Sequence, residues 1–135
     1  MTLPAPVPVI TPETQEFWSA TTQGRLLLRQ CRQCSEMIWY PRVICPGCHS
    51  LDTAWIEASG RGIIYSFSIA RRGQGAYTAA GPYVLAYVEL EEGPRMLTNI
   101  VGVDLEQVHI GQAVVVVFDS TGPDAALPRF RPVAS

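Results

Sequence analysis

The chain of 135 residues carries a formal net charge of −2, and all ten of its basic residues are arginines. This balance argues against nucleic-acid binding, which usually requires a net positive surface, and no stretch approaches the roughly 20 apolar residues of a membrane helix. Charged residues make up only 16% of the chain and hydrophobic residues 47%, so we expect a soluble, cytoplasmic protein with part of its surface covered by a partner.

The first ten residues contain prolines at every second position from Pro4 to Pro8. Because proline lacks a backbone N–H and disfavours helix, we expect an extended arm here. Such an arm is either a frayed terminus or a strap that clasps a partner.

A short helix is expected next, over residues 12–22. Thr11 has a side chain suited to an N-cap, Pro12 suits the first helical position, and Gly24 follows the end of the segment. Phe17 and Trp18 lie on this helix. They pack either on the core of the protein or on a second protein.

Four cysteines form two CxxC pairs, Cys31/Cys34 and Cys45/Cys48, and the chain has no other cysteine. Each pair can wrap a tight turn around one metal ion, and the residues between the pairs let the four thiolates meet in a tetrahedron. We predict a closed Zn(Cys)4 site. Four thiolates leave no coordination position for water or substrate, so the metal is expected to hold structure.

The four cysteines admit other interpretations. Rubredoxin-like iron is the main rival, because a tetrahedron of sulfurs suits both metals. Two disulfides would suit an exported chain, but no apolar leader segment follows Met1. A thioredoxin-like pair is expected at a helix start, whereas these pairs flank extended stretches. His49, next to Cys48, either substitutes as a ligand or lies on the surface.

Short extended segments are expected around the cysteines, at residues 25–30, 37–42 and 53–58. The glycine-rich residues 59–62 then indicate a turn or a close backbone approach. We therefore divide the chain into an N-terminal arm and helix (1–24), a metal-binding ribbon (25–58) and a main domain (59–135).

The main domain shows the two-residue alternation of β-strands. We expect strands at residues 63–70, 84–90, 95–101, 113–119 and 129–133. Asp104 and Gln107 form a capping-box pattern for one helical turn, which Gly111 closes. Five strands with a short helix between the third and fourth is the order of an OB-fold barrel. A split sandwich is the alternative.

The loop over residues 71–82 is long for a hairpin and contains Arg71, Arg72 and Tyr77. In an OB barrel the loop after the first strand borders the usual ligand face. These three residues are therefore candidates for a binding lip. The alternative is a solvated, flexible loop.

The sequence resembles a family of zinc-ribbon/OB-fold proteins, long classed as a domain of unknown function, that accompany thiolases and acyl-CoA enzymes. The likeness covers nearly everything from Phe17 to Pro132. Its marks are the four cysteines and the following short motifs: Phe17-Trp18, Gly24, Leu26, Pro41-Arg42, Cys45-Pro46, Trp55, residues 59–67, Pro82-Tyr83, residues 92–95, Ile110-Gly111 and Phe130-Arg131-Pro132.

This resemblance implies an N-terminal helix, a rubredoxin-like zinc ribbon held by Cys31, Cys34, Cys45 and Cys48, and an OB-fold that binds acyl-CoA or docks on its enzyme. Family members act as non-catalytic subunits of thiolase-like enzymes. These include aldolases that cleave acyl-CoA side chains in bacterial steroid breakdown. The chain departs from the family at Ser35, where glycine is common, and at His49, where a small residue is usual.

We therefore expect a non-catalytic accessory subunit of a thiolase-like enzyme of the sterol-carrier-protein type, in a hetero-oligomer that acts on acyl-CoA. Phe17, Trp18, Arg71, Arg72 and Tyr77 are the candidate ligand- or partner-binding residues. The alternatives are a stand-alone acyl-CoA-binding protein and a nucleic-acid-binding OB-fold.

A free-standing enzyme is a further alternative. The chain has two histidines and no cysteine outside the two pairs. His109 could act as a general base, although a lone histidine before a buried strand is more often structural. We therefore assign no catalytic residue.

Overall fold

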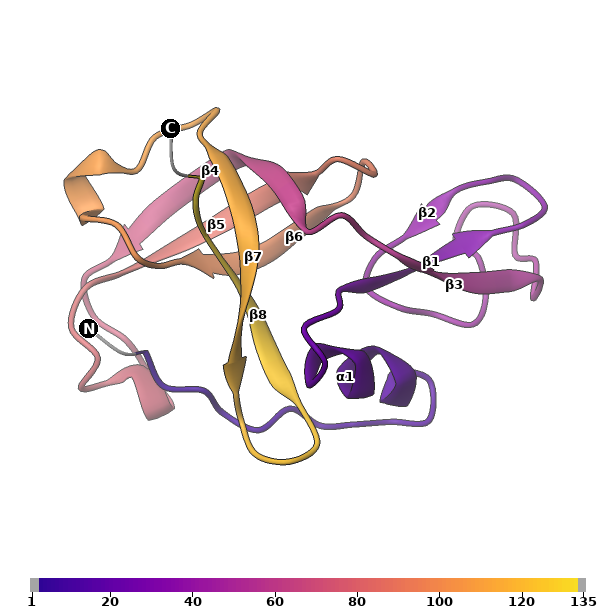
Figure 1. Cartoon of the computed structure of the whole chain (residues 1–135), viewed down its shortest axis with the longest axis horizontal. Coiled ribbons are helices and arrows are strands. Elements are labelled where there is room, and N and C mark those ends of the chain that lie inside the picture. The colour runs from indigo at the N-terminus through magenta and orange to yellow at the C-terminus, as the bar shows by residue number, and fades with distance from the viewer. Residues whose placement is uncertain (1–2, 134–135) are drawn as a thin grey trace.

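Two β-structures lie side by side in the computed structural model, which describes residues 3–133 (Figure 1). One is a three-stranded sheet near the cysteines, and the other is a closed five-stranded barrel. The helix α1 (Gln15–Thr21) lies between them in Figure 1. The mostly β fold that we expected, with an N-terminal helix, a zinc-ribbon region and an OB-type barrel, is confirmed. The ends of the arm and of the main domain, residues 1–2 and 134–135, lie outside the described residues.

The helix α1 begins later than predicted, and the N-cap assignment to Thr11 was wrong. Thr14 occupies the N-cap position, and its side chain does not cap the helix. Thr11 and Thr14 instead close a turn of their own: Thr14 N–H donates to Thr11 O at 3.0 Å, and Thr11 N–H donates to Thr14 Oγ1 at 3.2 Å. The C-terminal end at Thr22 is confirmed, with Gly24 in the left-handed region at φ 74°.

The small sheet consists of β1 (Leu27–Cys31), β2 (Met37–Ile38) and β3 (Thr53–Glu57) in the order β2-β1-β3, with antiparallel pairs. β2 is shorter than the predicted segment 37–42. After Ile38 the chain leaves the sheet, and the rings of Trp39 and Tyr40 pack edge-to-face on Phe17.

The barrel strands follow the predicted succession and close in the order β4-β5-β6-β8-β7, so the sandwich alternative was wrong. The predicted helical turn between the third and fourth barrel strands is a 3₁₀ turn, η2 (Leu105–Gln107), whose N-cap Asp104 makes no side-chain capping bond. The strands are β4 (Arg61–Ala70), β5 (Tyr83–Leu90), β6 (Arg95–Ile100), β7 (Ala113–Ser120) and β8 (Ala126–Pro132).

Gly62 lies where the barrel closes. It is opposite Leu90 on β5 and opposite Val114 on β7, so β4 is paired on both sides at this point. A Cβ atom at Gly62 would lie 2.5 Å from the carbonyl oxygen of Glu89. The close backbone approach predicted for residues 59–62 is thus confirmed.

One continuous hydrophobic cluster joins the helix, the small sheet and the barrel. Phe17 of α1 and Leu28 of β1 belong to the same buried cluster as Ile64, Val88 and Phe130 of the barrel. No helix within residues 3–133 is long and apolar enough to cross a membrane.

The N-terminal arm is extended, as predicted, and runs from the barrel towards α1 (Figure 1). Leu3 is buried, whereas Val7 and Val9 are exposed. The backbone carbonyl of Pro4 accepts a hydrogen bond from the barrel residue Arg129. The arm is therefore anchored to the chain's own barrel at its described start.

Candidate functional site

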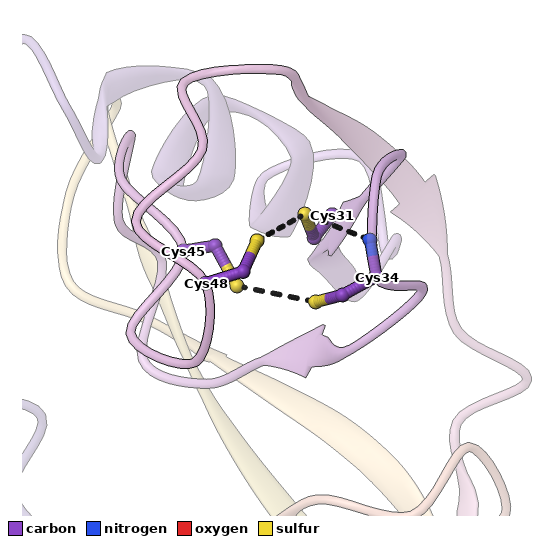
Figure 2. Close-up of side chains that lie close together, drawn as sticks. All are labelled: Cys31, Cys34, Cys45 and Cys48. Carbon is purple, nitrogen blue, oxygen red and sulfur yellow. Dashed lines mark hydrogen bonds between the residues drawn. The ribbon is translucent and has the colours of Figure 1, made fainter.

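The four cysteine sulfurs converge on one point, as Figure 2 shows. All four lie within 4.8 Å of one another, with Cys31 Sγ and Cys48 Sγ 3.5 Å apart and Cys34 Sγ and Cys45 Sγ 3.6 Å apart. Zn–S bonds of about 2.3 Å place the sulfurs of a tetrahedron about 3.8 Å apart. The four side chains are free thiols and fit a single tetrahedral ion, so they are positioned to bind a metal.

The two CxxC turns have the same backbone geometry. Ser35 N–H donates to Cys31 O, and His49 N–H donates to Cys45 O, both at 2.9 Å. Ser35 and His49 also both have positive φ. The side chain of His49 is exposed and is not among the converging ligand groups of residues 3–133, so the structure gives it a flanking position.

The thiols differ in their proton affinity. Cys34 N–H donates to Cys31 Sγ at 3.4 Å, and this backbone bond lowers the pKa of Cys31 to about 7. Backbone N–H groups also act on Cys34, Cys45 and Cys48, but burial and neighbouring side chains outweigh them and raise the pKa of each. Binding of a metal to all four thiolates must therefore release protons.

A carboxylate lies against the sulfur cluster. Glu36 Oε2 is 3.4 Å from Cys45 Sγ. It occupies space that Gly47 leaves open, because a Cβ atom at Gly47 would overlap this carboxylate. Sequence spacing gave no signal for this contact, which depends on how the two turns face each other.

Phe17 and Trp18, two of the candidate partner-binding residues, lie in the protein interior. Phe17 is 0% exposed and packs edge-to-face on Trp18 with ring centroids 4.9 Å apart. Trp18 Nε1 donates to the hydroxyl of Tyr40 at 3.1 Å. The structure thus gives both residues a core position, and Tyr40 is the exposed member of this aromatic cluster.

The loop after β4 carries the other three candidates. Arg71 and Arg72 are exposed and form no ion pair within residues 3–133. Tyr77 is half-buried in the turn η1 (Gly75–Tyr77), and its ring centroid lies 5.2 Å from that of Tyr83. The binding role of the three residues stays a prediction.

His109, the candidate base, is exposed. Its ring Nδ1 lies 3.2 Å from the backbone oxygen of Gln107. No ion pair between His109 and a carboxylate occurs in the described part of the chain.

Sequence reasoning missed an exposed apolar surface on the outside of the barrel. We call it the outer sheet face and define it as Ile63 and Tyr65 of β4, Tyr87 of β5 and Leu97 of β6. These side chains are 44–58% exposed. A strict two-residue alternation groups Ile63 and Tyr65 with Phe67 and Ile69, but the pairing of β4 with β5 shifts register between Ile64 and Ser66, so Ile63 and Tyr65 are exposed while Ile64 is buried.

Charged groups border the outer sheet face. The guanidinium of Arg95 lies over the ring of Tyr65, 3.7 Å from its centroid, and pairs with Glu89 at 3.0 Å. A groove of about 800 Å³ adjoins the face, with Arg61, Ile63 and Arg131 in its lining. No sequence motif pointed to this groove.

Comparison with known proteins identifies both parts of the fold. Residues 18–54 match the family model described as "ChsH2, rubredoxin-like zinc ribbon domain". Residues 55–119 match the model described as "ChsH2, C-terminal OB-fold domain".

Three similar proteins illustrate the range of relatives. A probable enoyl-CoA hydratase alpha subunit of Thermomonospora curvata is 36% identical over 127 residues, which cover 94% of this chain and 40% of that protein. A DUF35 domain-containing scaffold protein of Methanothermobacter thermautotrophicus is 35% identical over 78% of this chain and 81% of the relative. A solved chain of the "Ltp2-ChsH2(DUF35) aldolase" superposes with a TM-score of 0.82 and 36% identity, covering 93% of this chain and 98% of that one.

This chain thus spans less than half of the first relative but nearly all of the aldolase chain. The paired cysteine turns, the closed barrel and the sequence matches agree with one another. The chain belongs to the ChsH2-type DUF35 family, in which a rubredoxin-like zinc ribbon is joined to an OB-fold.

Proposed function

We propose that this protein is a non-catalytic accessory subunit of a thiolase-like enzyme of the sterol-carrier-protein type, which it stabilises and whose acyl-CoA site it helps to form. The proposed reaction is a retro-aldol cleavage in the breakdown of steroid side chains. Zinc held by the four cysteines would brace the subunit. The observation that carries the proposal is the outer sheet face.

The outer sheet face has the composition of a protein contact. Tyr87 lies directly opposite Leu97 across the β5–β6 pair, so their side chains form one exposed apolar surface. Contiguous apolar patches are uncommon on monomeric proteins unless they bind something. Tyrosine is also enriched at the centres of protein interfaces.

Charge at the edge of the face favours a partner with carboxylates. Arg61 and Arg131 line the adjoining groove, and neither forms an ion pair within residues 3–133. Arginine forks pair in a bidentate manner with carboxylates, which a partner subunit could present around an apolar centre.

The comparisons support the class of partner. The aldolase chain of 36% identity comes from a structure whose name joins two proteins, Ltp2 and ChsH2(DUF35). The relative named as a hydratase alpha subunit makes a hydratase-type enzyme the second candidate partner.

The test is co-expression of the full chain with a thiolase-like subunit and, separately, with a hydratase-type subunit from the same genome. Native mass spectrometry then measures complex formation. We expect a complex with the thiolase-like subunit, and a weakening of about tenfold or more for Tyr87→Asp or Leu97→Asp, because a carboxylate would be buried at the interface. Ile110→Asp, a matched change at an exposed apolar residue outside the outer sheet face, is the control.

Complex formation with the hydratase-type subunit alone would replace the first candidate with the second. Absence of any complex, together with unchanged activity of both partners, would refute the accessory role.

A further inference from the structure

Arg129 is a charged residue buried on the outer side of the barrel wall. On β8 its neighbour Phe130 belongs to the core cluster, so Arg129 lies on the opposite face of the strand. Its exposure is nevertheless only 1%. A guanidinium held away from water needs an acceptor for its N–H groups.

Two of its acceptors belong to barrel strands. Nε donates to Asn99 Oδ1 of β6 at 3.2 Å, and Nη1 donates to Asp119 Oδ2 of β7 at 2.5 Å. Asn99 is itself fixed, because its Nδ2 donates to Val84 O of β5 at 2.9 Å. The barrel thus fixes one side of the guanidinium.

The two remaining acceptors belong to segments outside the barrel. Nη2 donates to Pro4 O of the N-terminal arm at 2.6 Å and to the Tyr77 hydroxyl at 3.0 Å. Both hydrogens of one nitrogen are therefore used, one by the arm and one by the loop 71–82.

Each of these segments depends heavily on that nitrogen. Within the described residues, arm residues 3–10 make no other hydrogen bond, and the other hydrogen bonds of the loop 71–82 are internal, such as Ala80 N–H to Tyr77 O. Both segments also lie near Tyr83 at the start of β5: Leu3 of the arm lines the same cavity as Tyr83, and the Tyr83 ring packs on that of Tyr77.

We propose that Arg129 couples the N-terminal arm to the loop 71–82, so that the two segments dock on the barrel together and displacement of one loosens the other. When the arm leaves, water reaches Nη2 and competes with the Tyr77 hydroxyl for the guanidinium. Arg129 is thereby a positioning residue for a loop that carries Arg71 and Arg72. The coupling is a property of the free chain and holds whether or not the proposed partner binds.

The test uses NMR of the full chain without a partner. Leu3→Ala weakens the seat of the arm without substituting any residue of the loop. We expect the ¹⁵N order parameters of loop residues 73–80 to fall towards the flexible range below about 0.6. Solvent exchange of the Arg129 Nη2 hydrogens should accelerate about tenfold or more, because a buried charged hydrogen bond becomes accessible. Val9→Ala, the matched change at an exposed position of the same arm, should alter neither quantity.

The reciprocal variant is Tyr77→Phe, which removes the hydroxyl and keeps the ring on Tyr83. We expect the order parameters of Ala5 and Val7 to fall. Tyr83→Phe removes a neighbouring hydroxyl that makes no hydrogen bond in the described part of the chain, and it should leave the arm unchanged. A loop that stays rigid while Leu3→Ala frees the arm would overturn the coupling. If Leu3→Ala leaves the arm in place, Tyr77→Phe becomes the deciding test. Unchanged order parameters of the arm in Tyr77→Phe would then overturn the coupling.

Discussion

Ser35 and His49 occupy equivalent positions in the two cysteine turns and share a left-handed backbone, with φ of 66° and 63°. Each residue follows the second cysteine of its pair. Left-handed backbone costs a residue with a Cβ roughly 1–2 kcal/mol and costs glycine almost nothing. The glycine that the resemblance implies at position 35 therefore has a steric reason.

Ser35→Gly and His49→Gly should each stabilise the metal-loaded protein. We expect a gain of about 0.5–1 kcal/mol per site, because the backbone strain removed exceeds the entropy that glycine adds to the unfolded chain. Denaturant unfolding of the metal-loaded protein measures this gain. Gln33→Gly, in the first turn but without positive φ, should instead destabilise. Equal effects at positions 33 and 35 would contradict the strain argument.

The purified protein should contain one tetrahedral metal ion per chain, and removal of the ion should destabilise the whole chain. Cys45→Ser removes a buried ligand and chelation removes the ion itself, so the two cysteine turns lose their support, and the ribbon shares its core with the barrel. Elemental analysis distinguishes zinc from iron, and thermal unfolding measures the loss. Protein free of both metals but equally stable would contradict this prediction.

Metal affinity should fall on acidification. The pKa of Cys31 is lowered to about 7, so its thiolate is present above that pH and becomes protonated as the pH falls through it. Protons then compete with the ion for all four sulfurs. Competition with a chromophoric chelator across this range should show release that increases steadily towards lower pH. Retention independent of pH would argue against thiolate ligands.

Phe17→Ala should destabilise the free protein by about 3–5 kcal/mol, because it leaves a cavity where helix, ribbon and barrel meet. Tyr40→Phe removes only the acceptor of the Trp18 indole N–H and should cost about 1 kcal/mol. Urea unfolding without a partner measures both. If Phe17→Ala were neutral in stability yet prevented complex formation, Phe17 would belong to the partner surface.

Arg71→Ala combined with Arg72→Ala should leave the free energy of unfolding within about 0.5 kcal/mol, because both side chains are exposed. If the loop forms a binding lip, affinity for the partner or for acyl-CoA should fall about tenfold or more. Calorimetric titration measures the affinity. Arg42→Ala, an exposed arginine on the ribbon, is the matched control. Unchanged affinity in the double variant would favour the alternative, a solvated loop with no binding role.

Sequence alone was sufficient for features set by local spacing. The two CxxC pairs predicted the metal-binding turns. The period of two predicted the barrel strands and their succession along the chain. The start of α1 was missed because the side chains of Thr11 and Thr14 bond to each other, an arrangement that competes with capping and that residue preferences do not separate.

Features that depend on contacts between distant segments could not be predicted from the sequence. Burial of Arg129 requires Pro4, Tyr77, Asn99 and Asp119 to arrive from four separate parts of the chain. The outer sheet face was hidden for a different reason. Alternation places Ile63 and Tyr65 on the same side as Phe67 and Ile69, and it gives no sign of the register shift between Ile64 and Ser66 that turns Ile63 and Tyr65 outward.

The shared interior of helix, ribbon and barrel also limits how the chain can be divided. The two family models meet between residues 54 and 55, yet Phe17 and Leu28 on one side of that point contact the same cluster as Val88 and Phe130 on the other. A cut there would leave each fragment with an exposed hydrophobic surface that promotes aggregation. A fusion with another enzyme should therefore be joined outside the complete unit of helix, ribbon and barrel, and not between residues 54 and 55.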